Sequence, residues 1–154
     1  SAGFLVKRFG GVVSDEAMSN PLLKEIASSS EKIAELYEGR EYAKALRTVM
    51  ELADKVNGFV DENKPWEIAK DPEREAELQR VCSITLEAFR MLSLYLKPVI
   101  PQVAAGVEEF LSLPPLSWAD INTPLSSKNP IKPYKHLMTR VEAPQIEALL
   151  AANL

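Results

Sequence analysis

Eleven prolines divide this chain of 154 residues into two unlike parts. Residues 1–113 contain five prolines, whereas the much shorter stretch 114–154 contains six. Proline has no backbone N–H and a fixed φ, so it opens helices and interrupts their interior. The distribution predicts well-bounded helices in residues 1–113 and a mostly irregular segment in residues 114–154.

Between the prolines, apolar residues recur three and four positions apart, which is typical of amphipathic helices. Helices are predicted at residues 21–38, 41–62, 71–97 and 101–111, with a short one at 143–152 and the end of another at 1–9. Residues 81–96 are apolar on nearly every side, which favours a central buried helix. No stretch alternates as a strand would. We therefore expect an all-α antiparallel helix bundle over 1–113, with the proline-rich segment and short terminal helix of 114–154 packed on it.

The composition excludes several classes of protein. The net charge of −4 gives no overall basic field for nucleic acid or membrane. One cysteine and one histidine exclude an internal disulfide, a multi-histidine metal site and most catalytic triads. We therefore expect no catalytic residue, no metal site and no cofactor in this chain, and no activity from it alone. No apolar run is long enough to cross a membrane.

The N-terminus lacks the basic and apolar regions of a signal peptide. It suggests a chain that begins inside a longer protein. A single cysteine fits a reducing compartment, so we expect a cytoplasmic location.

The charge is unevenly distributed. Residues 14–113 contain 19 acidic and 12 basic side chains. The two ends are basic, and their cations are Lys7, Arg8, Lys128, Lys132, Lys135 and Arg140. Short basic runs are commonly just solvated faces, but these could also form a local edge for an anionic partner.

Trp66 is the strongest candidate for a binding residue. It follows Pro65 at a predicted helix–loop–helix corner among polar neighbours. Proline fixes the backbone there, and an exposed indole can stack on an unpaired nucleobase. A tryptophan that merely covers the end of the bundle would suit the same position, and both interpretations stay open at this point.

Asn57 lies on or beside the apolar stripe of the predicted helix 41–62, with Asp54 and Asp61 one turn to either side. The three side chains therefore share a face. Two acids there argue against a general phosphate site and could instead repel wrong ligands. The alternatives are an amide that pairs helices for Asn57 and a solvated acidic edge for Asp54 and Asp61.

Three other residues have simpler interpretations. Cys82 falls in the apolar helix and is expected to be a buried, inert thiol. His136 has no evident partner in the sequence. Trp118, which follows two prolines, is expected to anchor the proline-rich segment on the bundle.

Several stretches resemble the anticodon-binding domain of class I aminoacyl-tRNA synthetases. The common elements are residues 39–47 (GREYAKALR), 57–61 (NGFVD) and 64–67 (KPWE). Other pieces are similar to bacterial methionyl-tRNA synthetases, namely 2–4 (AGF), 7–9 (KRF), 94–101 (LYLKPVIP), 116–118 (LSW) and 133–137 (PYKHL). The likeness extends over essentially the whole chain.

The resemblance implies the C-terminal, helical part of an ATP-dependent ligase that joins methionine to its tRNA. It implies binding of the CAU anticodon, with Pro65 and Trp66 at the wobble cytosine and Arg140 near the anticodon. The family's catalytic signatures and zinc-binding cysteines are absent from these 154 residues. ATP, magnesium and any structural zinc would therefore belong to the catalytic domain of the same chain.

Two alternatives remain at this stage. One is the equivalent domain of another class I synthetase, and the other is a helical protein-interaction domain without an RNA partner. Neither DNA nor a membrane is an expected partner.

Overall fold

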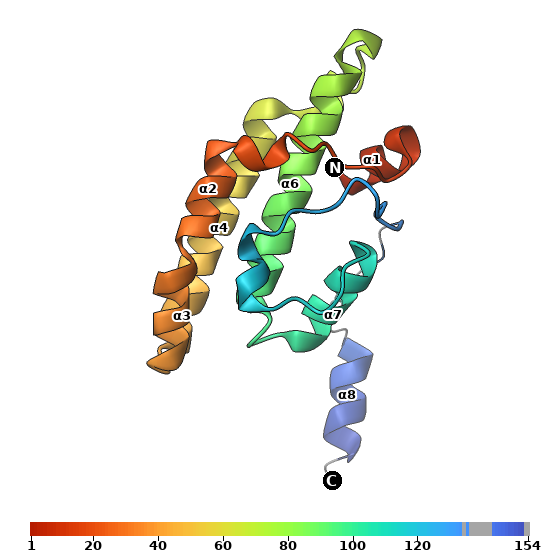
Figure 1. Ribbon diagram of the computed structural model, residues 1–154. Coiled ribbons are helices and arrows are strands. Elements are labelled where there is room, and N and C mark those ends of the chain that lie inside the picture. The colour runs from red at the N-terminus through yellow and green to blue at the C-terminus, as the bar shows by residue number, and fades with distance from the viewer. Residues whose placement is uncertain (134, 136–142, 153–154) are drawn as a thin grey trace.

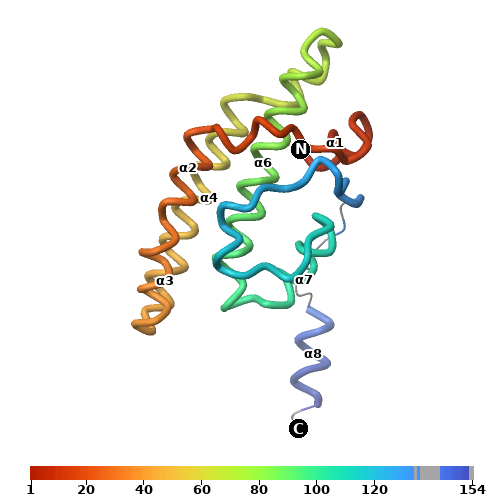
Figure 2. The backbone as a smooth tube through the Cα atoms, viewed as in Figure 1, coloured from red at the N-terminus to blue at the C-terminus, as the bar shows by residue number. Residues whose placement is uncertain are grey.

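A computed structural model describes residues 1–133, 135 and 143–152. Within this part of the chain every regular element is a helix and there is no strand, so the all-α prediction is confirmed. The long helices α4 and α6 run antiparallel, with α2 and α3 on one side of the pair and α1 and α7 on the other (Figure 1). Figure 2 shows the same path as a tube.

The α-helices are α1 (Ala2–Phe9), α2 (Pro21–Ser28), α3 (Ser30–Glu38), α4 (Tyr42–Asn63), α5 (Pro65–Ile68), α6 (Glu75–Leu96), α7 (Pro101–Phe110) and α8 (Ala143–Ala152). Short 3-10 helices are η1 (Ala17–Ser19), η2 (Pro72–Arg74) and η3 (Trp118–Asn122). Prolines stand at the first turn of α2, α5, η2 and α7, as expected for a residue whose missing N–H is harmless there.

The single helix expected over residues 21–38 is wrong, because two helices, α2 and α3, occupy it and meet at Ser29. The hydroxyl groups of Ser28 and Ser29 both donate to the carbonyl of Glu25. Such local side-chain bonds compete with the backbone hydrogen bonds of a helix, and here they lie where α2 ends. The apolar spacing continues through the break, so periodicity could not reveal it.

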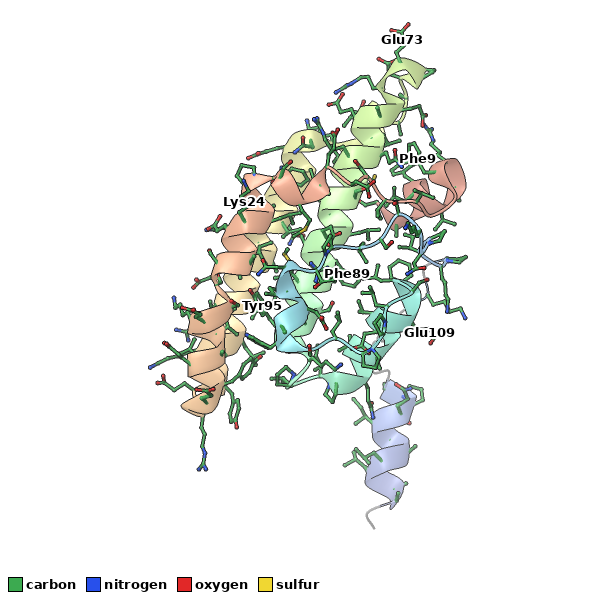
Figure 3. The ribbon with its side chains drawn as sticks, viewed as in Figure 1. Phe9, Lys24, Glu73, Phe89, Tyr95 and Glu109 are labelled. Carbon is green, nitrogen blue, oxygen red and sulfur yellow. The ribbon has the colours of Figure 1, made fainter. Side chains whose placement is uncertain are left out.

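Helix α6 is the centre of the molecule, as predicted. Its second half packs with α2, α3 and α4 in one apolar cluster, and its first half packs with α1, α5 and α7 in another. Figure 3 shows Phe89 and Tyr95 along this helix. The Tyr95 side chain is completely buried, and its hydroxyl donates to the carbonyl of Ile26 at 2.5 Å.

The proline-rich segment crosses the bundle irregularly, with η3 as its short regular element among the described residues. Leu116 and Ile121 join the first cluster, and Leu125 and Ile131 join the second. Trp118 packs against Tyr37 and Tyr95, with ring centroids 6.2 and 5.3 Å away. The expected role of Trp118 as an anchor is confirmed.

A buried ion pair on α6 also holds this segment. Glu87 and Arg90, 2% and 0% exposed, lie 2.8 Å apart. Glu87 accepts the backbone N–H of Leu125, and Arg90 donates to the carbonyls of Asp120 and Ile121. The two charges are thus satisfied by the backbone of the segment that they fix.

Helix α8 has no buried residue, and the side chains of Ile146, Leu149 and Leu150 are exposed. The expected division of the chain at residues 113 and 114 stays a prediction. No helix among the described residues is long and apolar enough to span a membrane.

Candidate nucleic-acid interface

A sharp corner between α4 and α5 presents Trp66. Lys64 has left-handed backbone angles, φ 46° and ψ 66°, which turn the chain after Asn63. The Lys64 carbonyl then accepts the N–H groups of Glu67 and Ile68 at 2.8 and 3.2 Å. Pro65 and Ile68 are buried and fix the corner to the core.

Trp66 is 45% exposed at this fixed corner. No other aromatic ring of the described residues stacks on its indole. Beside it, Lys70 and Glu67 form a solvent-exposed ion pair. The corner therefore holds a large flat ring in water on a backbone that the core fixes, a geometry suited to stacking with a planar ligand.

Asp54, Asn57 and Asp61 lie on α4 about one to three turns before the corner, and all three are exposed. Among the described residues the Asn57 amide has no hydrogen-bond partner. The face is acidic apart from this amide. It would therefore repel a phosphate, whereas a neutral group could form hydrogen bonds with the amide.

The two basic ends of the sequence meet in space. The Ile131 N–H donates to the Gly11 carbonyl at 3.0 Å, and the Lys132 N–H donates to the Phe110 carbonyl at 2.9 Å. Lys7, Lys132 and Lys135 are exposed, and Arg8 forms a 2.6 Å ion pair with Glu75. The same apolar cluster contains Leu5 of α1 and Ile68 of α5, so these cations belong to the same half of the molecule as Trp66.

Arg140 and His136 lie outside the described residues. Cys82 is buried, and burial raises the pKa of its thiol, which opposes a reactive thiolate. In the described ranges no cluster of histidine, cysteine and carboxylate side chains could hold a metal.

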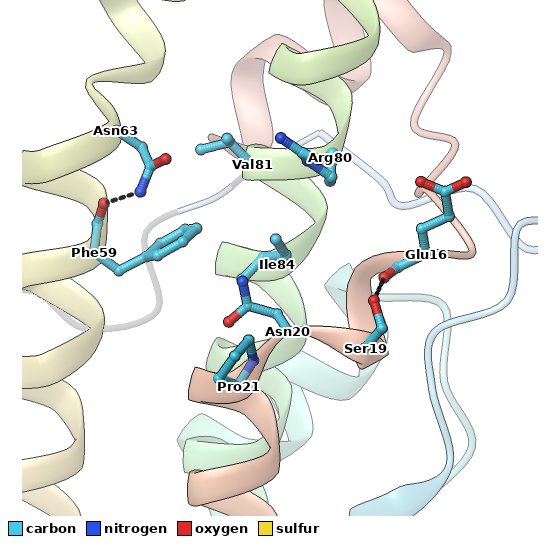
Figure 4. Close-up of a pocket in the computed structure, with 9 residues that line it drawn as sticks. All are labelled: Glu16, Ser19, Asn20, Pro21, Phe59, Asn63, Arg80, Val81 and Ile84. Atoms are coloured by element: carbon cyan, nitrogen blue, oxygen red, sulfur yellow. Dashed lines mark hydrogen bonds between the residues drawn. The ribbon is translucent and has the colours of Figure 1, made fainter.

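A polar hollow of about 320 Å³ lies between the end of α4, the start of α2 and α6 (Figure 4). Asn63 and Phe59 line it from α4, and Arg80 lines it from α6. Asn63 donates to the Phe59 carbonyl at 2.8 Å. Glu16 also borders the hollow and offsets the charge of Arg80, so the hollow does not favour an anion.

An apolar groove lies on α4 and α6. Its α4 side is formed by Met50, Ala53, Val56, Asn57 and Val60, and its α6 side by Thr85, Leu86, Phe89, Leu92, Ser93 and Leu96. Ala2 of α1 and Phe110 of α7 complete it. We call this the α4/α6 groove; Asn57 is its exposed amide.

Solved structures share this fold. Methionyl-tRNA synthetase from Mycobacterium tuberculosis, in its free state, superposes with a TM-score of 0.81 over 92% of this chain and 30% of that chain, at 20% identity. The same enzyme in complex with methionyl-adenylate gives a TM-score of 0.75 over 90% of this chain and 29% of that chain, at 19% identity. The fold is therefore that of a part of an aminoacyl-tRNA synthetase.

Sequence comparison specifies the family. The family described as "Anticodon binding domain of methionyl tRNA ligase" matches residues 10–143. Methionine–tRNA ligases from Cupriavidus metallidurans and Burkholderia cenocepacia are 58% and 60% identical over 99% of this chain. The chain belongs to the anticodon-binding domains of methionyl-tRNA ligases. It matches the C-terminal part of these relatives and spans only 22% and 21% of their length.

Sequence reasoning missed two features of this region. The left-handed Lys64 was not anticipated, because a lysine carries no signal for that conformation. The contact between Gly11 and Ile131 was also missed, because it joins residues far apart in the sequence.

Proposed function

We propose that this domain binds the anticodon loop of a tRNA and that Trp66 stacks on one of its bases. The observation that carries the proposal is an indole 45% exposed on a corner that buried Pro65 holds in place. Proteins recognise single-stranded RNA loops by stacking splayed bases on aromatic rings and by hydrogen bonds to base edges. The partner that family membership supports is tRNA(Met), with Trp66 under the wobble cytosine of its CAU anticodon.

The neighbouring residues have distinct proposed roles. Asn57 offers an amide to the loop, whereas Asp54 and Asp61 disfavour tRNAs with other anticodons. Lys7, Lys132 and Lys135 contact phosphates, which contributes affinity without sequence preference. Arg140 approaches the anticodon from the C-terminal segment. Residues 1–113 form the bundle that carries the corner, and residues 114–154 form the segment that carries the second basic end.

The full-length protein is proposed to attach methionine to tRNA(Met) with ATP in the cytoplasm. Its catalytic domain would hold ATP, magnesium and any structural zinc, and none of its catalytic residues would lie in this chain. A complex of the Mycobacterium tuberculosis enzyme contains methionyl-adenylate, which is consistent with this division.

Fluorescence of Trp66 tests the proposal directly. In the full-length protein, Trp118→Phe leaves Trp66 as the one tryptophan of these 154 residues. A matched variant that also carries Trp66→Phe measures the fluorescence that does not come from Trp66. A stem-loop with the CAU anticodon should quench the Trp66 signal, and the quenching should weaken with salt. A loop with the wobble cytosine replaced should bind less tightly. Binding without any change in the Trp66 signal would contradict the stacking role.

A further inference from the structure

The polar hollow between α2, α4 and α6 has no role in the function proposed above. It lies on the side of the α4–α6 pair that carries α2, whereas the α4/α6 groove with Asn57 is completed by α1 and α7 on the other side (Figure 1). Its volume of about 320 Å³ is at the small end of the roughly 300–1,000 Å³ of small-molecule sites. The space therefore suits a small ligand with a single ring system.

The inner wall of the hollow is apolar and contains an aromatic ring. Val81 and Ile84 of α6 are 2% and 4% exposed, and the half-buried ring of Phe59 packs against both apolar clusters of the core. Figure 4 shows the Phe59 ring pointing from α4 toward Ile84. A ring that the core holds in place offers a flat surface on which a planar ligand can stack.

Two side-chain amides border this wall, and each is already engaged at one end. The Asn20 side-chain oxygen accepts the Leu22 N–H at 2.9 Å at the start of α2, which leaves the amide N–H groups as donors. The Asn63 amide nitrogen donates to the Phe59 carbonyl at 2.8 Å, which leaves the amide oxygen as an acceptor. These bonds fix the orientation of both amides, so the hollow presents a donor and an acceptor at set positions.

Opposite charges balance at the rim of the hollow. Arg80 and Glu16 both border it and are both exposed. A phosphate attracted by Arg80 would be repelled by Glu16, whereas a neutral ring would pay little to leave water. The planar guanidinium of Arg80 can also stack on a heteroaromatic ring. The rim therefore favours a ligand that is flat and uncharged.

We propose that this hollow binds an adenine base. Adenine is a flat, neutral purine whose edge carries an amino donor beside a ring-nitrogen acceptor, and asparagine amides pair with these groups. The base would lie against Phe59, donate its amino hydrogen to the Asn63 oxygen and accept from Asn20 at a ring nitrogen. A free nucleoside and an unpaired nucleotide of an RNA offer the same base. The proposal does not depend on stacking at Trp66.

Thiol protection in the full-length protein tests this site separately from any nucleotide bound elsewhere. Ser19→Cys places a thiol on the exposed rim of the hollow, and labelling is followed on the peptide that carries it. Ser28→Cys is the matched control, because both hydroxyls are exposed and donate to a carbonyl three residues back, yet Ser28 does not line the hollow. The native Cys82 is buried.

Adenosine and tRNA, added separately, distinguish the two sources of the base. A ligand at about ten times its Kd should slow labelling of the Ser19→Cys thiol about tenfold, because only the free site reacts. Protection by adenosine, but not by adenosine dimethylated on its amino group, identifies a free nucleoside. Protection by tRNA alone, lost when the unpaired adenines of its loop are made abasic, identifies an RNA base. Protection by neither ligand, or by methionine instead, would overturn the proposal.

Asn20→Asp then separates binding from folding. Aspartate caps a helix as well as asparagine does, so α2 should keep its start while the amide donor is lost. In the Ser19→Cys protein this change should abolish the protection and leave the unfolding midpoint unchanged. Asn129→Asp adds the same charge at an exposed position outside the hollow and should retain the protection. Full protection in Asn20→Asp, or its loss in both variants, would contradict the assigned contact.

Discussion

The backbone N–H of Ile131 donates to the carbonyl of Gly11. The two segments of chain lie so close together there that Gly11 has no room for a side chain. A Cβ built on Gly11 would lie 2.5 Å from the Ile131 carbonyl oxygen and 3.0 Å from its nitrogen. Gly11 also has a φ of +80°. This contact joins the first and second basic ends of the sequence.

Gly11→Ala should destabilise the domain by about 2–4 kcal/mol, because it adds this clash to the strain of a left-handed alanine. Gly10→Ala is the matched control. Its φ is +60°, but no atom lies within 4 Å of a Cβ there. The control should lose only about 1 kcal/mol. Urea unfolding of both variants measures the difference, and equal losses would show that the close approach costs nothing.

Glu87→Ala should destabilise the domain by about 3–5 kcal/mol, because it leaves the buried Arg90 guanidinium without its carboxylate. The Leu125 N–H would lose its acceptor as well. Glu77→Ala removes a carboxylate paired at the same spacing with Arg74 on the exposed start of α6. The Glu77→Ala control should leave the unfolding midpoint unchanged within experimental error. A similar loss of stability in both variants would mean that burial of the Glu87–Arg90 pair does not increase the cost of removing its carboxylate.

Tyr95 should make the domain sensitive to alkali. Burial raises the pKa of its hydroxyl well above its ordinary value near 10. Because the folded state holds the proton more tightly than the unfolded state, this stability is complete below pH 10 and is lost as the pH rises further. Tyr95→Phe should lower stability at pH 7 by about 1 kcal/mol, for the lost hydrogen bond, and flatten the decline above pH 10.

Denaturant unfolding between pH 7 and 11 measures this dependence. Tyr42→Phe, at an exposed position, should leave the slope unchanged. Burial raises the pKa of Tyr37 too, so some decline should remain in Tyr95→Phe. Parallel curves for the native protein and Tyr95→Phe would contradict the prediction.

Trp66→Ala in the full-length protein should weaken binding of cognate tRNA by about 1–3 kcal/mol, and Trp66→Phe should retain part of the stacking. Methionine activation without tRNA should not change, because the proposed function assigns that chemistry to the catalytic domain of the full-length protein. Isothermal titration and pyrophosphate exchange measure the two quantities. A tryptophan that only covers the bundle would instead lower the melting temperature and leave the affinity of the folded protein normal.

Replacing both Asp54 and Asp61 by Ala should increase binding of non-cognate tRNA more than binding of cognate tRNA. Two exposed carboxylates beside the corner repel phosphates that are presented in the wrong position. Binding of both tRNAs is compared in the full-length protein at fixed salt. Equal increases for both tRNAs would mean that Asp54 and Asp61 form only a solvated acidic edge with no role in specificity.

Helix starts were the most predictable part of this fold. The prolines at 21, 72 and 101 marked expected starts because proline fits the first helical turn, whereas the short helix α5 that begins at Pro65 was not predicted. The apolar character of α6 predicted its central position, but it could not reveal that Glu87 and Arg90 are buried within it. Their partners are backbone groups some 30 residues away, and no pattern in α6 encodes them.

At the candidate site, local spacing predicted that Asp54, Asn57 and Asp61 share a face, because i+3 and i+7 positions align on any helix. It could not predict the groove beside Asn57, which needs α1, α6 and α7 as well as α4. The approach of the two basic ends of the sequence also depends on a long-range contact, the one between Gly11 and Ile131. Sequence patterns therefore located the residues, and tertiary packing determined what surrounds them.

Because α6 contributes one half to each apolar cluster, the two cores have a common backbone. Neither could melt alone without breaking a helix whose middle residues, from Val81 to Ala88, are largely inaccessible to water. The amide hydrogens of α6 should therefore exchange with deuterium together, through one cooperative opening. The corner that presents Trp66 would keep its shape until the whole domain unfolds. Binding of a tRNA would therefore cost the protein little conformational entropy, because this surface is already ordered.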